Sequence, residues 1–156
     1  MSKTNYLYEQ AAKLIESAQS LVIIQADNPD ADSLGSALAI EQIMTDLGKY
    51  TRLYCGVDMP GYLHFMSGWS RVEKELPNDF DLAILVDVST VNLLDKITTD
   101  KNYNQYKKSK HLVLDHHKSV SDEIDADVLI NLPELSSTGE LIFNLAIHNG
   151  WALSPT

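Results

Sequence analysis

The chain has 156 residues, of which 44% are hydrophobic and 22% are charged, and its formal net charge at pH 7 is -10. This length and composition suit one globular domain with a substantial core. The negative charge argues against stable binding to duplex nucleic acid or to an anionic membrane surface, because both require a basic face. It does not exclude a phosphate substrate, since bound divalent cations would reverse the local field.

A single cysteine, Cys55, excludes an internal disulfide and is typical of a reducing compartment. The N-terminal residues contain no signal-peptide core, and no apolar run reaches the length of a transmembrane segment. We therefore expect a cytoplasmic protein that does not bind membranes.

Hydrophobic periodicity predicts helices and strands that alternate along the chain. In chain order we expect a helix over residues 4–19, a strand over 21–24, a helix from 31 or 32 to 47, a strand over 52–55, a loop or short helix over 59–66, a strand over 82–86, one or two surface helices over 90–110, strands over 112–114 and 128–130, and a helix over 136–149. This alternation predicts a three-layer α/β fold, in which a mostly parallel central sheet has helices on both faces.

The chain contains no repeat and no interdomain linker, so residues 1–156 are interpreted as one domain. Its last residues, 151–156, carry apolar side chains and resemble the middle of a domain. We therefore expect this domain to be truncated at its C-terminal end.

Acidic residues follow three of the predicted strands at the point where each strand ends. They are Asp27, Asp30 and Asp32 after the first strand, Asp87 after the strand over 82–86, and Asp115, followed by His116 and His117, after the strand over 112–114. The carboxyl ends of parallel strands open onto the ligand crevice of such a sheet. Carboxylates and imidazoles without a thiolate favour Mn²⁺ or Mg²⁺ over Zn²⁺ or Fe²⁺. Two such ions, about 3.5–4 Å apart, would clamp both oxygens of a phosphoryl displacement.

Each of these groups also has a purely structural interpretation. Asp30 or Asp32 alone would serve as the N-cap of the following helix. Asp87 alone would cap a turn, and the two adjacent histidines would be solvated loop residues. Acids at three strand ends favour a common site over three separate coincidences.

The stretches that carry these residues resemble the first three motifs of the DHH phosphoesterase superfamily. The three stretches are residues 28–36, 86–87 and 115–117, and residues 136–141 resemble a further stretch of its nanoRNase-like branch of oligoribonucleases and pAp phosphatases. The resemblance implies a DHH-type N-terminal catalytic domain. It also implies hydrolysis of phosphoester bonds in short oligonucleotides or pAp-like nucleotides by a water that two metal ions, usually Mn²⁺, activate.

The resemblance assigns roles to individual residues. Asp30 would bind one metal and Asp32 the other, and Asp87 would bridge the two. His116 would be a metal ligand, while His117 would contact the scissile phosphate or support the site.

Three further residues flank the proposed site. Asp115 would fix the local geometry or orient a histidine. Ser89 and Ser119 follow acidic strand ends and are candidates for phosphate contacts, with a solvated loop as the alternative for both.

The sequence departs from the family pattern in two places. A metal-binding histidine of the first motif corresponds to Ala26, so the first metal site loses a donor. Either Asp27 or Gln25 takes its place, or the first ion is bound weakly or not at all, and the sequence leaves both alternatives open. The fourth metal motif and the C-terminal substrate-binding domain are absent from this chain.

These departures leave two other functions open. One is a degenerate, non-catalytic module that binds a nucleotide or a metal, and the other is an inorganic pyrophosphatase of the family-II type. The stretches over residues 28–30 and 136–141 favour the nucleotide branch over the pyrophosphatase. The expected partner is a nucleotide substrate, and a homodimer is left open.

Overall fold

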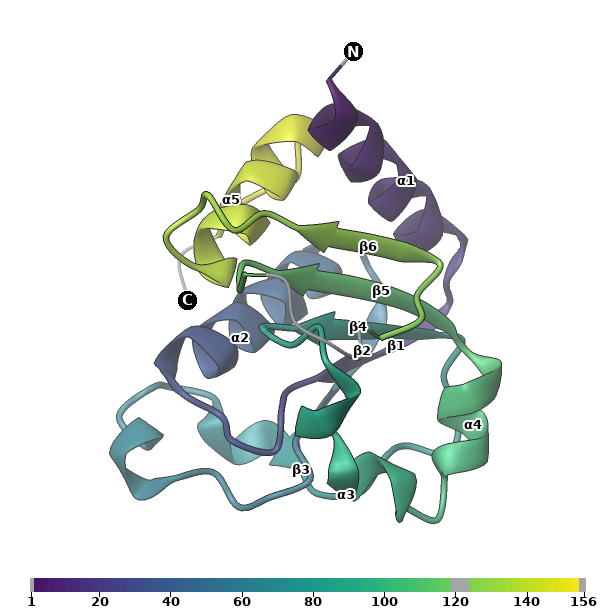
Figure 1. The fold of residues 1–156 in the computed structure, drawn as a ribbon, viewed down its shortest axis with the longest axis vertical. Helices are drawn as coiled ribbons and strands as arrows, with labels where there is room; N and C mark the ends of the chain where they lie inside the picture. The colour runs from purple at the N-terminus through teal and green to yellow at the C-terminus, as the bar shows by residue number, and fades with distance from the viewer. Residues whose placement is uncertain (1, 119–123, 155–156) are drawn as a thin grey trace.

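The centre of the molecule is a six-stranded sheet in which all neighbouring strands are parallel (Figure 1). The computed structural model describes residues 2–118 and 124–154. The strands are β1 (Ser20–Ile24), β2 (Tyr50–Tyr54), β3 (Val72–Glu73), β4 (Leu82–Val86), β5 (Lys110–Asp115) and β6 (Val128–Asn131). Their order across the sheet is β3-β2-β1-β4-β5-β6.

The strand order reverses between β1 and β4. From β1 the chain builds outward through β2 to β3, and it then returns to β4 and builds the other half through β5 to β6. Such a switch point leaves a crevice at the carboxyl ends of the two central strands, and this crevice is the usual ligand site of an open α/β sheet.

Helices cover both faces of the sheet, as the sequence predicts. The helices α1 (Lys3–Ser17), α2 (Ala31–Asp46) and α5 (Thr138–Asn149) pack on one face, and the short helices α3 (Asp95–Thr98) and α4 (Tyr103–Lys108) pack on the other (Figure 1). Every residue of β4 is buried, because successive side chains alternate between the two apolar clusters. Ile84 lies in the cluster with the three long helices, and Ala83 lies in the cluster with α3 and α4.

The ends of the long helices follow capping rules with one exception. Gly48 and Gly150 follow α2 and α5 with φ angles of 73° and 67°, in the left-handed region that glycine adopts at helix ends. The sequence over Ser137–Glu140 has the pattern of a capping box, but only half of the box forms. The Ser137 hydroxyl accepts from the Glu140 amide at 3.0 Å, but the Glu140 carboxylate accepts from the Ser136 amide and hydroxyl instead of the Ser137 amide.

The three-layer α/β fold predicted from the sequence is confirmed. The sequence missed β3, because a strand of two residues leaves no periodic pattern. Cys55 is fully buried, as expected for a small apolar side chain. Among residues 2–118 and 124–154, no helix combines the length and the apolar character needed to cross a bilayer.

Candidate metal centre

Asp87 lies at the carboxyl end of β4 in an unusual backbone conformation. Its φ angle is 59°, in the left-handed region that residues other than glycine rarely adopt. Its backbone amide donates to the Leu114 carbonyl of β5 at 2.9 Å, and the residue is 7% exposed. Strain of this kind persists where the surrounding structure fixes a residue, and it is common at functional sites.

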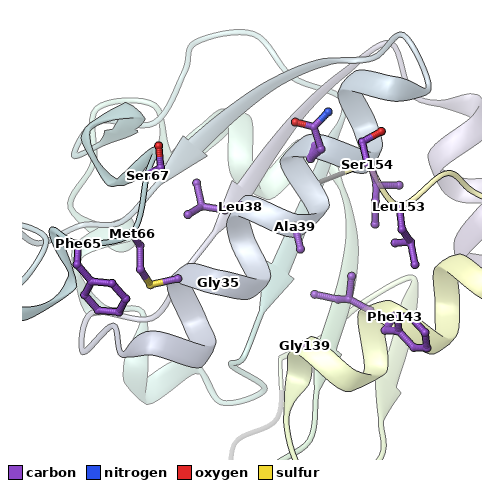
Figure 2. A pocket seen from close by; sticks show the side chains of 13 residues that line it. Gly35, Leu38, Ala39, Phe65, Met66, Ser67, Gly139, Phe143, Leu153 and Ser154 are labelled. Carbon is purple, nitrogen blue, oxygen red and sulfur yellow. The ribbon is translucent and has the colours of Figure 1, made fainter. Parts of the chain in front are cut away.

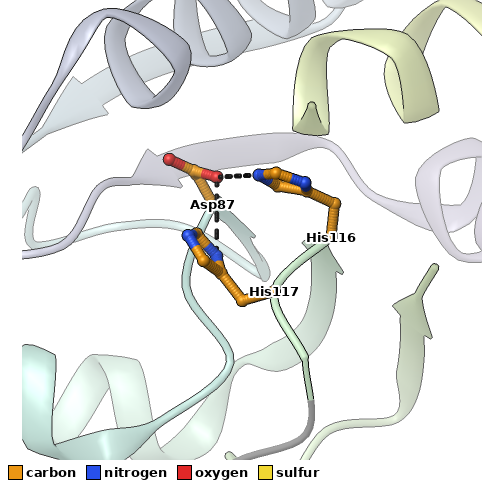
Figure 3. Close-up of side chains that lie close together, drawn as sticks. All are labelled: Asp87, His116 and His117. Atoms are coloured by element: carbon orange, nitrogen blue, oxygen red, sulfur yellow. Dashed lines mark ion pairs between the residues drawn. The ribbon is translucent and has the colours of Figure 1, made fainter. Parts of the chain in front are cut away.

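Two histidines at the end of β5 face the Asp87 carboxylate (Figure 3). The His116 Nε2 atom lies 3.7 Å from Asp87 Oδ1 and 3.4 Å from Asp32 Oδ2, at the start of α2. The His117 Nδ1 atom lies 3.8 Å from Asp87 Oδ1. The donor atoms of Asp87, His116 and His117 all lie within 4.8 Å of one another. Donors on a six-coordinate ion with bonds of about 2.1 Å are about 3 Å apart, so these side chains would have to move closer together to hold a divalent cation.

The two histidines differ in the nitrogen that is available to a ligand. Asp115 is fully buried, and its Oδ1 atom lies 2.7 Å from His117 Nδ1. This nitrogen therefore carries the proton and donates to Asp115, which leaves only Nε2 of His117 with a free lone pair. His116 makes one longer contact, from Nδ1 to the Leu135 carbonyl at 3.4 Å, and its Nε2 points at the carboxylates. His116 is thus the better placed ligand.

Replacing Asp115 by asparagine is expected to lower the pKa of His117. The hydrogen bond that His117 donates to Asp115 raises the pKa of His117 above its usual value, and the charges of Asp115, Asp87 and Asp30 add to this effect. Asparagine keeps the shape of the side chain but removes its charge. The measurement is an NMR titration of the imidazole resonances without metal, with His148, at the far end of α5, as the internal control. An unchanged titration of His117 would contradict the pairing.

The N-terminal turn of α5 holds two of the site carboxylates. The backbone amides of Thr138 and Gly139 donate to Asp32 Oδ2 at 2.8 Å and to Asp32 Oδ1 at 3.1 Å. The hydroxyl of Thr138 donates to Asp87 Oδ1 at 2.8 Å. Sequence reasoning missed Thr138 as a site residue, although the family-like stretch over residues 136–141 was a signal for it.

The pKa of Asp87 is raised to about 6, chiefly by burial and also by the charges of Asp32 and Asp30, while the hydrogen bond from Thr138 opposes the rise. Three carboxylates close together repel one another, and a bound cation would relieve this repulsion. The electrostatics of the cluster therefore favour a divalent cation over an anion.

Asp30 combines a structural contact with a place near the cluster. Its Oδ1 atom accepts from the Ser33 amide at 2.9 Å, so it caps α2 as the structural interpretation expects. Its charge also acts on Asp87 and on His117, which places it within electrostatic reach of both. Asp30 can therefore cap α2 and contribute its charge to the candidate metal centre at the same time.

The side chains that flank Ala26 have hydrogen-bond partners outside the cluster. Gln25 is fully buried beneath α2, where its Oε1 accepts from the Ser33 hydroxyl at 3.2 Å. The Asp27 Oδ2 atom accepts from the Lys96 amide in α3 at 2.9 Å. Within the part of the chain that the structure describes, neither makes a hydrogen bond or an ion pair with the site acids or histidines. Their role as substitute ligands stays a prediction.

The two candidate serines fall in different situations. Ser89 is 4% exposed, and its carbonyl accepts from the Ile124 amide at 2.8 Å, so it does not lie in a solvated loop. Ser119 lies outside the described residues.

A groove of about 470 Å³ runs along the outer side of α2 and α5 (Figure 2). Its lining is largely apolar and includes Leu38, Phe65 and Phe143. Gly139 lines one part of it, next to the amide that binds Asp32, but the groove contains none of the site acids or histidines. The groove is therefore separate from the candidate metal centre.

Comparison with known structures shows the same fold in two proteins. An exopolyphosphatase-related protein from Bacteroides fragilis matches with a TM-score of 0.82 and 22% sequence identity, over 96% of this chain and 46% of that chain. The exonuclease RecJ bound to manganese matches with a TM-score of 0.59 and 13% identity, over 98% of this chain and 40% of that chain. This chain thus spans about half the length, or less, of both proteins. No curated protein matches it.

Residues 20–154 match the family described as "DHH family, N-terminal domain". The match covers all six strands and the candidate metal-centre residues Asp30, Asp32, Asp87, His116 and His117. The chain therefore belongs to the DHH family.

Proposed function

We propose that this chain is a metal-dependent phosphoesterase module that hydrolyses phosphoester bonds in short oligonucleotides or pAp-like nucleotides. The observation that carries the proposal is the convergence of Asp32 and Asp87 on His116 at the carboxyl edge of the sheet, where His116 Nε2 lies 3.4 Å from Asp32 Oδ2 and 3.7 Å from Asp87 Oδ1. The manganese bound by RecJ, which shares the fold, supports Mn²⁺ as the cation, with Mg²⁺ as the alternative.

Two cation positions follow from the proposal. Asp32, Asp87 and His116 would hold one ion, and Asp30 and Asp87 would hold the other. When bound, such ions neutralise the phosphate charge and supply a nucleophilic water at neutral pH. The cation position at His116 has the more complete set of ligands. The other position lacks a nitrogen donor, because the Ala26 side chain cannot coordinate a metal and packs in an apolar cluster.

The chain's own side chains would orient the substrate at this edge. Asp115 holds a proton on His117 Nδ1 and fixes the ring, so that Nε2 of the protonated imidazole would donate to a phosphate oxygen. The imidazole is 56% exposed, so a substrate can reach it. His117 is therefore assigned to the scissile phosphate, and Ser119 is a further candidate for the same group.

A non-catalytic module that binds a nucleotide or a metal is the second candidate. It is favoured by Ala26, which is 4% exposed and leaves the first cation position without a nitrogen donor. We further propose that residues 1–156 form one domain that works together with a substrate-binding domain. Turnover by this chain alone would then be weak.

A hydrolysis assay with Mn²⁺ separates the candidates. The substrates are a dinucleotide, 3′-phosphoadenosine 5′-phosphate and inorganic pyrophosphate. We expect cleavage of one of the nucleotides, and we expect Asp87→Asn to lower the rate by about 100-fold or more, because the bridging charge is lost. The control is Asp79→Asn, an exposed acid that precedes β4 at the opposite edge of the sheet.

The other outcomes identify the alternatives. Cleavage of pyrophosphate alone would make the protein a pyrophosphatase. Specific Mn²⁺ binding without cleavage of any of the three would support the binding module.

A further inference from the structure

One residue of α5 contacts two carboxylates of the candidate metal centre that come from different parts of the chain. The Thr138 amide donates to Asp32 at 2.8 Å, and the Thr138 hydroxyl donates to Asp87 at 2.8 Å. Asp32 belongs to the first turn of α2, and Asp87 follows β4. Thr138 therefore links three separate elements at the carboxyl edge of the sheet.

The hydroxyl of Thr138 is not needed to cap its own helix. Ser137 is the N-cap of α5, and its hydroxyl accepts from the Glu140 amide at 3.0 Å. The Thr138 hydroxyl instead points into the molecule, where the residue is fully buried. Its hydrogen-bond partner is the Asp87 carboxylate, which is itself buried.

The oxygen that Thr138 holds is the one that faces the histidines. Asp87 Oδ1 lies 3.7 Å from His116 Nε2 and 3.8 Å from His117 Nδ1. A hydroxyl bonded to this oxygen fixes the rotation of the carboxylate and leaves its other lone pairs for a cation. Threonine suits this task because its β-branch restricts the side chain to few rotamers.

We propose that Thr138 is a positioning residue that sets the orientation of Asp87, and with it the affinity of the site for a divalent cation. The proposal rests on the proposed function, since it assigns the cation to Asp87 and its neighbours. It goes further because it makes metal affinity depend on a residue of α5. That residue acts through Asp87 and is not itself a proposed ligand of the cation. Outer hydrogen bonds of this kind typically change metal affinity by about 10- to 100-fold.

The test is a calorimetric titration of the whole chain with MnCl₂ at pH 7.5. Thr138→Val keeps the shape and the backbone amide but removes the hydroxyl, and we expect it to weaken Mn²⁺ binding by about 10-fold. Thr138→Ser restores a hydroxyl and should bind Mn²⁺ nearly as tightly as the wild type. Ser137→Ala is the matched control, because it loosens the same helix end without touching Asp87. It should lower the melting temperature and leave Mn²⁺ affinity unchanged.

Equal Mn²⁺ affinity in Thr138→Val and the wild type would overturn the proposal. So would an equal loss in Ser137→Ala, because the effect would then come from a loosened helix. Should the valine variant fail to fold, Thr138→Ala replaces it, and wild-type affinity in that variant would be equally decisive. A wild-type chain that binds no Mn²⁺ would contradict the proposed function itself, which separates that failure from a failure of the role of Thr138.

Discussion

Asp87→Asn is expected to stabilise the metal-free protein at pH 7.5 and to abolish its stabilisation by Mn²⁺. Burial raises the pKa of Asp87 to about 6, so the folded protein binds a proton at this site more readily than the unfolded chain. The contribution of this carboxyl group to stability is therefore present below about pH 4 and is lost as the pH rises through about 6. Asparagine carries no charge, so it removes the cost of burying the carboxylate, and it tolerates the positive φ at this position as aspartate does.

The expected gain is on the order of 1–3 kcal/mol at pH 7.5, and it should shrink towards zero at pH 4. Thermal melts with a chelator at the two pH values measure it, and melts with added Mn²⁺ measure the loss of the metal response. Asp79→Asn should behave as the wild type in both. An Asp87→Asn variant that is less stable than the wild type at pH 7.5, or that still responds to Mn²⁺, would contradict the assignment.

Mn²⁺ is expected to raise the melting temperature of the wild type, and His116→Ala should remove most of this effect. At a free Mn²⁺ concentration about 100 times the Kd, binding adds about 2.7 kcal/mol to the free energy of unfolding. For a chain of 156 residues this corresponds to a rise of about 5–11 °C. His116 supplies the nitrogen that lies closest to the Asp32 and Asp87 carboxylates. We therefore expect His116→Ala to reduce the Mn²⁺ effect more than His117→Ala does.

The comparison with His117→Ala makes this prediction specific. Because Asp115 engages His117 Nδ1, alanine at this position should reduce the Mn²⁺ effect only partly. His148→Ala, late in α5, controls for the loss of an imidazole elsewhere. A greater loss in His117→Ala than in His116→Ala would reverse the roles of the two histidines.

The fold followed from local patterns that the sequence displays directly. The apolar runs that became β1, β4 and β5 are bounded by polar residues, and the alternation with helices implied a parallel sheet. Since parallel strands end at one edge, the acids that follow them had to converge. The grouping of Asp87, His116 and His117 was therefore predictable without coordinates.

Features that depend on tertiary packing were not predictable in this way. The contact between Thr138 and Asp87 joins residues far apart in the chain, and the docking of α5 against α2 and β5 creates it. The positive φ of Asp87 leaves no trace in the residue type. The short strand β3 and the burial of Ser89 likewise arise from neighbours that a local pattern does not contain.

The missing donor at Ala26 shows how sequence and structure complement each other. The sequence identified the position and named Gln25 and Asp27 as replacements. In the structure, Gln25 lies under α2, where it accepts a hydrogen bond from a hydroxyl. Asp27 lies against α3, where it accepts one from a backbone amide. We therefore propose two cation positions of unequal affinity, with the stronger one at His116.

Anomalous diffraction from crystals soaked in MnCl₂ would locate the cation itself. We expect a manganese peak within bonding distance of Asp32, Asp87 and His116, and no such peak in crystals of Asp87→Asn. A manganese ion bound elsewhere on the acidic surface, with this cluster empty at saturating metal, would contradict this expectation.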